Sequence, residues 1–177
     1  MRLFIGVIFA LCAICFQTAL AKDAIAYKEL TWDDLVPEDW HPERIFNTLN
    51  IDELSDDDPR VARVMEIFMK EWEKSPVNPK IDGMRIKLPG YVAPLDWEED
   101  EKLAEFLLVP YFGACIHVPP PPPNQIIHVK PKKPLKDVVT MDTVWIYGVI
   151  RLETSDSGSM GTSGYAMIAD KVELYIQ

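Results

Sequence analysis

The spacing of apolar residues along this chain changes once, from a helical period to an alternating one. In the helical part, apolar side chains recur every three or four positions, at Val61, Val64, Met65, Phe68 and Trp72. An acidic residue followed by proline, Asp58-Pro59, is typical of a helix start, so we predict a helix from there to about Lys74. Its apolar face is expected to be buried against the rest of the domain.

After Asp82-Gly83 the pattern becomes that of strands. Residues 84–95 alternate and contain Pro89-Gly90, which indicates a bend within one long, coiled strand. Further strands are predicted at residues 103–111, 126–129, 143–152, 165–169 and 171–176. Residues 154–164 are rich in Ser and Gly and are expected to be flexible.

This order of elements predicts a mainly β fold. We expect a small OB-like antiparallel barrel with one N-terminal amphipathic helix, because closing the sheet removes its exposed edges; a β-sandwich is the alternative. Residues 22–80 would form an acidic and helical wrap and residues 81–177 the barrel, together a single domain.

The wrap begins with an acidic segment that contains two tryptophans. Thr31 or Asp33 is expected to cap a short helical turn that Pro37 ends, and Trp32, Leu35 and Trp40 are expected to anchor the segment. An alternative role for this segment is cation binding through Asp33, Asp34, Glu38, Asp39 and His41.

The first residues predict export. Arg2 precedes an apolar block at residues 3–16, and Ala19-Leu20-Ala21 supplies a small-residue cleavage site, so residues 1–21 are predicted to be a signal peptide cleaved near Ala21. The protein would then be periplasmic or secreted. Neither cysteine of this leader follows a small residue, as lipid attachment requires, so no lipid anchor is expected.

Charge and cysteine content narrow the possible functions. The net charge of −10 argues against binding to nucleic acid or to anionic membrane surfaces. After the predicted cleavage only Cys115 remains, which excludes an internal disulfide.

The most unusual stretch is residues 106–125, in which an apolar run leads to Cys115, His117 and five consecutive prolines. Proline fixes φ and lacks a backbone donor, so Pro119–Pro123 are predicted to be neither helix nor interior strand but a stiff, extended rod. Such rods often dock to aromatic grooves. The residues predicted to bind a partner are Pro119, Pro120, Pro121, Pro122, Pro123, Asn124 and Gln125.

The same stretch is a candidate metal site. Cys115 and His117 are two positions apart, so in an extended segment both side chains point to one face and could share a metal ion. His128, on the strand after the prolines, is the best candidate for a third ligand. Zinc normally takes three or four ligands and copper(I) two or three soft ones, so zinc or copper is the expected metal.

Two other interpretations stay open. In a purely structural one, Cys115 is a small buried side chain, and His117, Asn124 and Gln125 hydrogen-bond backbone groups that the prolines leave unpaired. In an enzymatic one, His117 or His128 activates Cys115 as a nucleophile or redox centre. After the predicted leader, which carries Cys12 and Cys15, no C-x-x-C pair and no cysteine-protease signature is present, so a non-enzymatic protein is favoured.

Three stretches, residues 90–95, 106–125 and 144–148, resemble a family of exported bacterial proteins and lipoproteins classed as a domain of unknown function. Its signature phrase is FLLVPYFGACIHVPPPPPNQ, and the resemblance spans Trp32 to Ile176. Some members are encoded beside transporters of the macrolide-export or lipoprotein-release type, and others within zinc-responsive gene sets. The resemblance therefore implies a role in envelope metal handling, with an envelope transporter or another periplasmic protein as partner.

Overall fold

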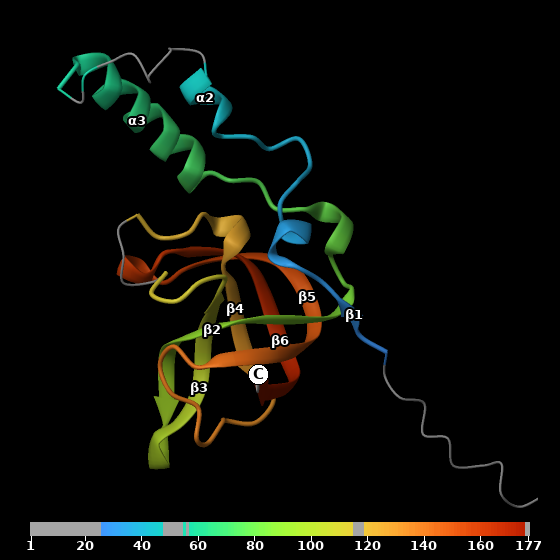
Figure 1. Cartoon of the computed structure of the whole chain (residues 1–177). Helices are drawn as coiled ribbons and strands as arrows, with labels where there is room; N and C mark the ends of the chain where they lie inside the picture. Colours follow the sequence, from blue (N-terminus) through green and yellow to red (C-terminus); the bar gives the residue numbers. More distant parts are fainter. Residues whose placement is uncertain (1–25, 48–54, 56, 115–118, 176–177) are drawn as a thin grey trace, which may run out of the picture.

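The computed structural model describes residues 26–47, 55, 57–114 and 119–175. The predicted signal peptide lies outside this range. The strands are β1 (Lys28–Glu29), β2 (Arg85–Glu98), β3 (Lys102–Val109), β4 (Ile127–Pro131), β5 (Thr143–Asp156) and β6 (Thr162–Leu174) (Figure 1). The α-helices are α2 (Arg44–Asn47) and α3 (Pro59–Glu73), and the 3-10 turns are η1 (Trp32–Leu35), η3 (Pro79–Ile81), η4 (Glu99–Glu101), η5 (Pro123–Gln125) and η6 (Gly158–Met160).

The strand pairings close a ring in the order β2, β3, β4, β6, β5 and back to β2. This confirms the predicted fold class, a mainly β, small barrel-like sheet with a helix. One detail of the prediction is wrong, because β4 and β6 are parallel. A closed ring of five strands cannot alternate direction all the way round, so at least one neighbouring pair has to be parallel.

The predicted bend in the first long strand is confirmed. β2 pairs with β5 up to Tyr91 and with β3 from Tyr91 onward. A β-carbon at Gly90 would lie 2.7 Å from Leu108 Cγ and 2.9 Å from the carbonyl oxygen of Val109, so only glycine fits where the strand changes partner. The Trp32 indole fixes the same point, since its Nε1 donates a hydrogen bond to Pro89 O at 2.8 Å.

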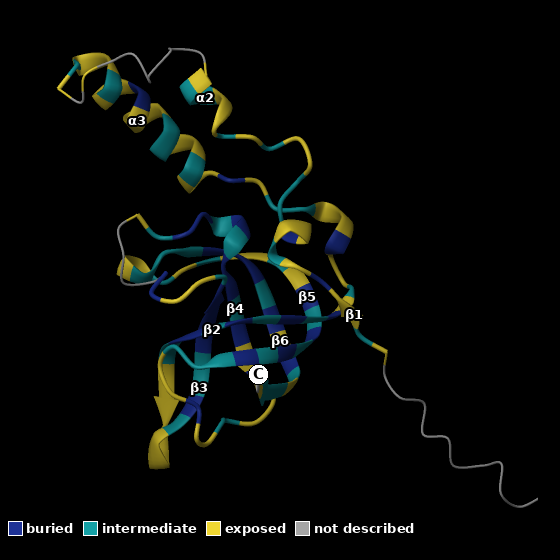
Figure 2. Cartoon of the chain, viewed as in Figure 1, coloured by how far each residue is buried: buried dark blue, intermediate teal, exposed yellow. Residues whose placement is uncertain are grey.

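Alternate residues of the strands fill the interior of the ring (Figure 2). The fully buried side chains there include Ile86, Leu88, Phe106, Leu108, Ile127, Val129, Ile146 and Ile150. The intervening positions of β3 face the other way, and Leu107 and Val109 pack with Ala93, Ala114 and Ile126 in a smaller cluster. This outer cluster lies under the connection from β3 to β4.

Two predictions for the C-terminal hairpin are wrong. The two short strands predicted on either side of Asp170 are one strand, β6, in which Asp170 is the extra residue of a bulge opposite Tyr147 and Gly148. The Asp170 carboxylate binds Tyr27, Arg85 and Lys132 on the surface. The stretch predicted to be flexible is largely strand as well, because β5 and β6 stay paired as far as Asp156 and Thr162.

The helix α3 has the predicted start, with the Asp58 side chain accepting a hydrogen bond from Arg60 N at 2.9 Å. Its predicted burial is wrong, because Val64 is its one buried residue and Met65 is 49% exposed. The axis of α3 points away from the barrel, so only its last turn approaches the sheet (Figure 1). The rest of α3 packs on α2, where the centroids of the Phe46 and Phe68 rings lie 4.8 Å apart. No helix in the described part of the chain is long and apolar enough to cross a membrane.

Candidate functional site

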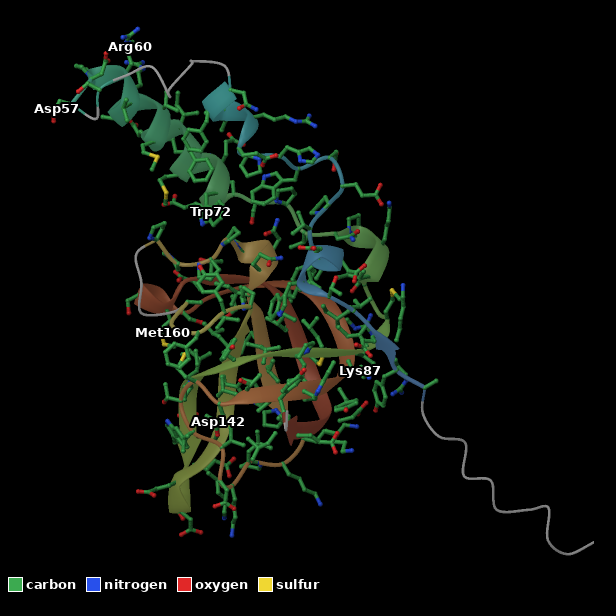
Figure 3. All side chains as sticks on the ribbon, viewed as in Figure 1. Asp57, Arg60, Trp72, Lys87, Asp142 and Met160 are labelled. Carbon is green, nitrogen blue, oxygen red and sulfur yellow. The ribbon has the colours of Figure 1, made fainter. Side chains whose placement is uncertain are left out.

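The proline segment, Pro119–Pro123, belongs to the connection between β3 and β4, at the end of the barrel that faces α3 (Figures 1 and 3). Cys115 and His117 precede it and lie outside the described residues. Their described neighbours differ in burial: Ala114 is 1% exposed and packs in the outer cluster, whereas Pro119 is exposed.

The backbone of the proline segment is extended, as predicted, at Pro122, where φ is −67° and ψ is 156°. The prediction that none of these prolines is helical is wrong for Pro123, which begins η5. Proline is tolerated at the first position of a helical turn because that position needs no backbone donor. The segment is therefore a short rod that ends in a tight turn.

Internal contacts hold this rod between the barrel and the wrap. Trp72 Nε1, from the last turn of α3, donates a hydrogen bond to Pro120 O at 2.9 Å. Asn124 is fully buried, where its backbone N–H donates to Ser75 Oγ at 3.1 Å and its Nδ2 donates to Pro76 O at 3.0 Å. Gln125 Nε2 donates to Trp32 O at 2.8 Å. Asn124 and Gln125 thus bond backbone carbonyls, as the structural interpretation expected, but these carbonyls belong to the wrap and not to Pro119–Pro123.

A residue that the sequence analysis missed completes this attachment. The hydroxyl of Tyr165, on β6, donates to Leu35 O at 2.6 Å and accepts from the Asn78 N–H at 2.6 Å. Burial raises the pKa of Tyr165 to about 12. Tyr165 stands in an apolar strand, so its sequence context indicates only a buried position and not its two partners in the wrap.

Aromatic side chains are exposed just before the Cys115–His117 segment. Tyr111 is 49% exposed and Phe112 is 67% exposed. The Phe112 ring packs edge-on against the Tyr91 ring, with 6.0 Å between the ring centroids. The next residue, Gly113, has a φ of 80° and donates its N–H to Met141 Sδ at 3.3 Å. The connection therefore turns sharply here and leaves two rings in contact with solvent.

His128, the predicted third ligand, lies on β4 as expected, opposite Leu107 of the outer cluster. Its Nε2 is 2.9 Å from Glu105 Oε2. The hydrogen bond from Lys130, and after it the one from His128, holds the pKa of Glu105 below its usual value. The result is a His–Glu–Lys group on the outer face of β3 and β4, in which His128 and Glu105 are partly buried and Lys130 is exposed.

The described residues do not form a metal site by themselves. Nowhere in the described ranges do three His, Cys, Asp or Glu side chains gather closely enough to hold a metal ion. In the wrap, His41 Nδ1 lies 3.2 Å from Glu43 Oε1, so this histidine has one carboxylate partner. Of the acidic residues there, Asp34 accepts hydrogen bonds from Thr31, the N-cap of η1, and Glu38 pairs with Lys80.

Comparison with known proteins identifies the family. Residues 32–174 match a family model described as "Protein of unknown function (DUF3299)". The chain belongs to the DUF3299 family. A crystal structure of a DUF3299 family protein from Pseudomonas aeruginosa PAO1 is similar, with a TM-score of 0.65 and 35% sequence identity over 86% of this chain and 98% of that chain. No curated protein matches.

The resemblance noted in the sequence is thus confirmed at the level of the DUF3299 family, whose match includes the wrap, the proline segment and the barrel. The signature phrase and export remain predictions. In this DUF3299 protein, the described part of the connection between β3 and β4 attaches the wrap to the barrel through Asn124 and Gln125, and exposes Tyr111, Phe112 and Pro119.

Proposed function

We propose that this protein is exported and acts without catalysis, as an envelope protein that binds a zinc or copper ion through Cys115 and His117, with His128 as the third ligand. The main support is that both flanks of the short segment carrying the thiol and the imidazole are fixed. Ala114 is buried in the outer cluster on one side, and on the other the rod is held by the hydrogen bond from Trp72 to Pro120. Flanks that are held in place favour metal binding, because less conformational entropy is lost when the ligands between them are ordered.

Neighbouring donors also support a soft metal ion. Met141 and Met160 pack on the same outer cluster as Ala114, and thioether sulfur suits copper(I). The contact between His128 and Glu105 resembles the carboxylate–histidine pairs that orient metal-binding imidazoles, in which the second ring nitrogen binds the ion.

A cobalt(II) titration of the purified protein tests this proposal. We expect thiolate-to-cobalt charge-transfer absorption that Cys115→Ser abolishes, and His117→Ala is expected to weaken binding about 100-fold, since each ligand contributes roughly 3 kcal/mol. His41→Ala, a change in an exposed histidine of the wrap, is the matched control and should leave the titration unchanged.

The proposal fails if no such absorption appears and zinc or copper(I) does not change the reactivity of the thiol. A Cys115 thiol that alkylates rapidly with a pKa well below about 8.5, with or without metal, would instead favour the enzymatic alternative with Cys115 and His117.

A second candidate function is docking of an envelope transporter or another periplasmic protein at Tyr111, Phe112 and Pro119, whose exposure favours it. Asn124 is fully buried, so its side chain would contribute only indirectly. With a photoreactive benzoylphenylalanine in place of Phe112, we expect one defined crosslinked envelope protein in cells. The same group in place of Glu71, exposed on α3, should not trap that protein, and equal crosslinking from both positions would contradict docking.

A further inference from the structure

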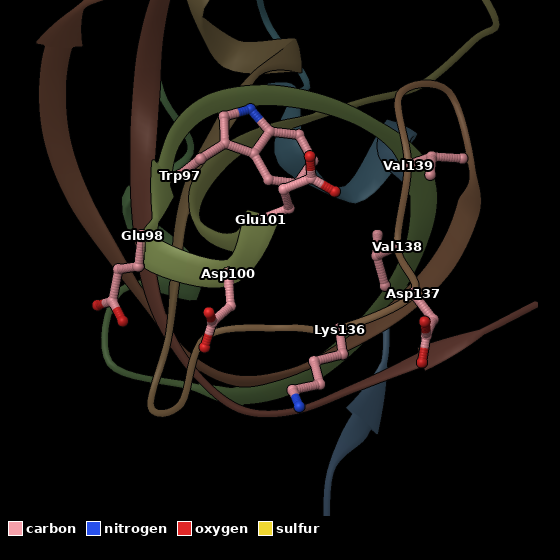
Figure 4. A pocket seen from close by; sticks show the side chains of 8 residues that line it. All are labelled: Trp97, Glu98, Asp100, Glu101, Lys136, Asp137, Val138 and Val139. Carbon is pink, nitrogen blue, oxygen red and sulfur yellow. The ribbon is translucent and has the colours of Figure 1, made fainter.

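A pocket lies at the other end of the barrel from α3, between the turn that joins β2 to β3 and the loop that joins β4 to β5 (Figures 1 and 4). It has a volume of about 630 Å³. The residues that line it are Trp97, Glu98, Asp100, Glu101, Lys136, Asp137, Val138 and Val139.

The two walls of this pocket are tied together. Leu103, at the start of β3, and Leu135, in the loop after β4, exchange two backbone hydrogen bonds of 2.9 Å. Val138, only 9% exposed, belongs to the main core and anchors the lining to the barrel. The pocket is therefore part of the folded framework and is not a gap between independent loops.

Trp97 differs from the other tryptophans. Trp32 and Trp72 donate indole hydrogen bonds, Trp40 packs against Trp72, and Trp145 stacks on Tyr175. Within the described residues the Trp97 side chain has no hydrogen bond and no ring contact, and the residue is 44% exposed. A large aromatic face is thus open to the pocket and has no internal partner (Figure 4).

The charges around the Trp97 ring are mostly of one sign. Four carboxylates, from Glu98, Asp100, Glu101 and Asp137, line the pocket with one ammonium group, that of Lys136. Asp100 forms a salt bridge with Lys102, whereas Glu101 and Asp137 have no salt bridge to any residue that the structure describes. These carboxylates form no metal-binding group of three or more side chains within the described residues. They are spread around the pocket as a negative rim.

We propose that this pocket binds an organic cation: an ammonium or guanidinium group on an apolar stem, such as a lysine or arginine side chain. The face of Trp97 attracts the cation, since an indole ring is the best aromatic partner for one. Glu101 and Asp137 accept charge-assisted hydrogen bonds from it. Val138 and Val139 contact the apolar stem. This function is independent of the metal binding proposed above, because none of the proposed metal ligands lines the pocket.

The source of the cation is a free amine or a basic side chain of a partner protein, and two probes distinguish them. We would titrate the protein with cadaverine, and with a capped pentapeptide that has a central lysine, while following the five indole N–H signals by NMR. We expect saturable shifts at Trp97 with at least one probe. Acetylation of the lysine, which removes its charge, should abolish the shifts caused by the peptide.

Two variants measure the predicted contributions. Trp97→Leu is expected to weaken binding about fivefold, measured by calorimetry. The double variant Glu101→Gln/Asp137→Asn is expected to weaken it about tenfold or more. Asparagine tolerates the left-handed backbone of Asp137, where φ is 61°, so the fold should be retained. The matched control is Asp57→Asn/Glu71→Gln, which changes two exposed carboxylates, one just before α3 and one on it. It removes the same charge and should leave the affinity unchanged.

Each outcome decides the proposal. Binding of cadaverine alone supports a free amine as ligand, and binding of the lysine peptide alone supports a basic segment of a partner. Equal binding of the acetylated peptide, full affinity in both pocket variants, or no shift at Trp97 with millimolar concentrations of both probes would overturn it. Saturable calcium binding at these carboxylates without amine binding would overturn it as well.

Discussion

Replacing Gly164 with alanine is expected to lower the free energy of unfolding by about 3 kcal/mol. A β-carbon at this position of β6 would lie 2.6 Å from Val77 Cγ1 and 2.7 Å from Pro123 O. Val77 is partly buried against the core, and the oxygen of Pro123 belongs to the backbone of a stiff segment, so either the wrap or the proline segment has to move. Chemical denaturation of the purified protein measures the loss.

A glycine in an open place is the control for this substitution. Gly158 has a φ of +63° and no neighbour within 4 Å of the position a β-carbon would take. Gly158→Ala should therefore cost only the strain of the left-handed backbone, about 1–2 kcal/mol. If Gly164→Ala were no more destabilising than Gly158→Ala, the close contact between β6 and the proline segment would not limit stability.

The second large effect is expected from Tyr165→Phe, which removes one hydroxyl and leaves one buried and one partly buried backbone group of the wrap without a partner. Leu35 O loses its donor and the Asn78 N–H loses its acceptor, so the variant should be less stable by about 2–4 kcal/mol. Tyr147→Phe, a change in a partly exposed tyrosine, is the matched control and should cost less than about 1 kcal/mol. Similar losses in both variants would contradict the attachment role of Tyr165.

Tyr165 also predicts a dependence on pH. Burial raises its pKa from 10.0 to about 12, so the hydroxyl keeps its proton to a higher pH in the folded chain than in the unfolded chain. Its stabilising contribution is full below about pH 10 and is lost as the pH rises from about 10 to 12. The difference in stability between wild type and Tyr165→Phe should shrink over this interval, and a constant difference would contradict the shift.

Local signals in the sequence predict the elements of this fold well. Asp58-Pro59 indicates the start of α3 because a side-chain cap and a proline suit that position whatever the helix packs on. Pro89-Gly90 indicates the bend in β2 because few residues tolerate such close backbone contacts. These features depend on a few adjacent residues, so one sequence is enough to find them.

Features that depend on distant residues were not predictable in the same way. The apolar stripe of α3 implied burial against the domain, but the partner is α2, and the direction of the helix is set by contacts at Trp72. Asp170 interrupts the apolar pattern of β6, so the sequence indicated the end of a strand there. The partners that hold Asp170 in place within the strand, Tyr27, Arg85 and Lys132, come from three separate segments and could not be recognised from its neighbours. Strand order likewise follows from long-range pairing.

The same limit applies to the sites. Five consecutive prolines indicated a rigid segment, but its attachment through Trp72 and Tyr165 required the three-dimensional arrangement. A run of four acidic residues, such as that at positions 98–101, is by itself typical of a solvated surface. The pocket beside Trp97 exists because residues 136–139, far along the chain, supply its other wall.

The position of β6 has a consequence for how the protein is made. This last strand pairs with both β4 and β5, and so closes the ring between them. A nascent chain that lacks its final residues has two open strand edges and cannot complete its hydrogen bonding. A truncated chain that stops before Thr162 is therefore expected to pair its open edges with other chains and to aggregate.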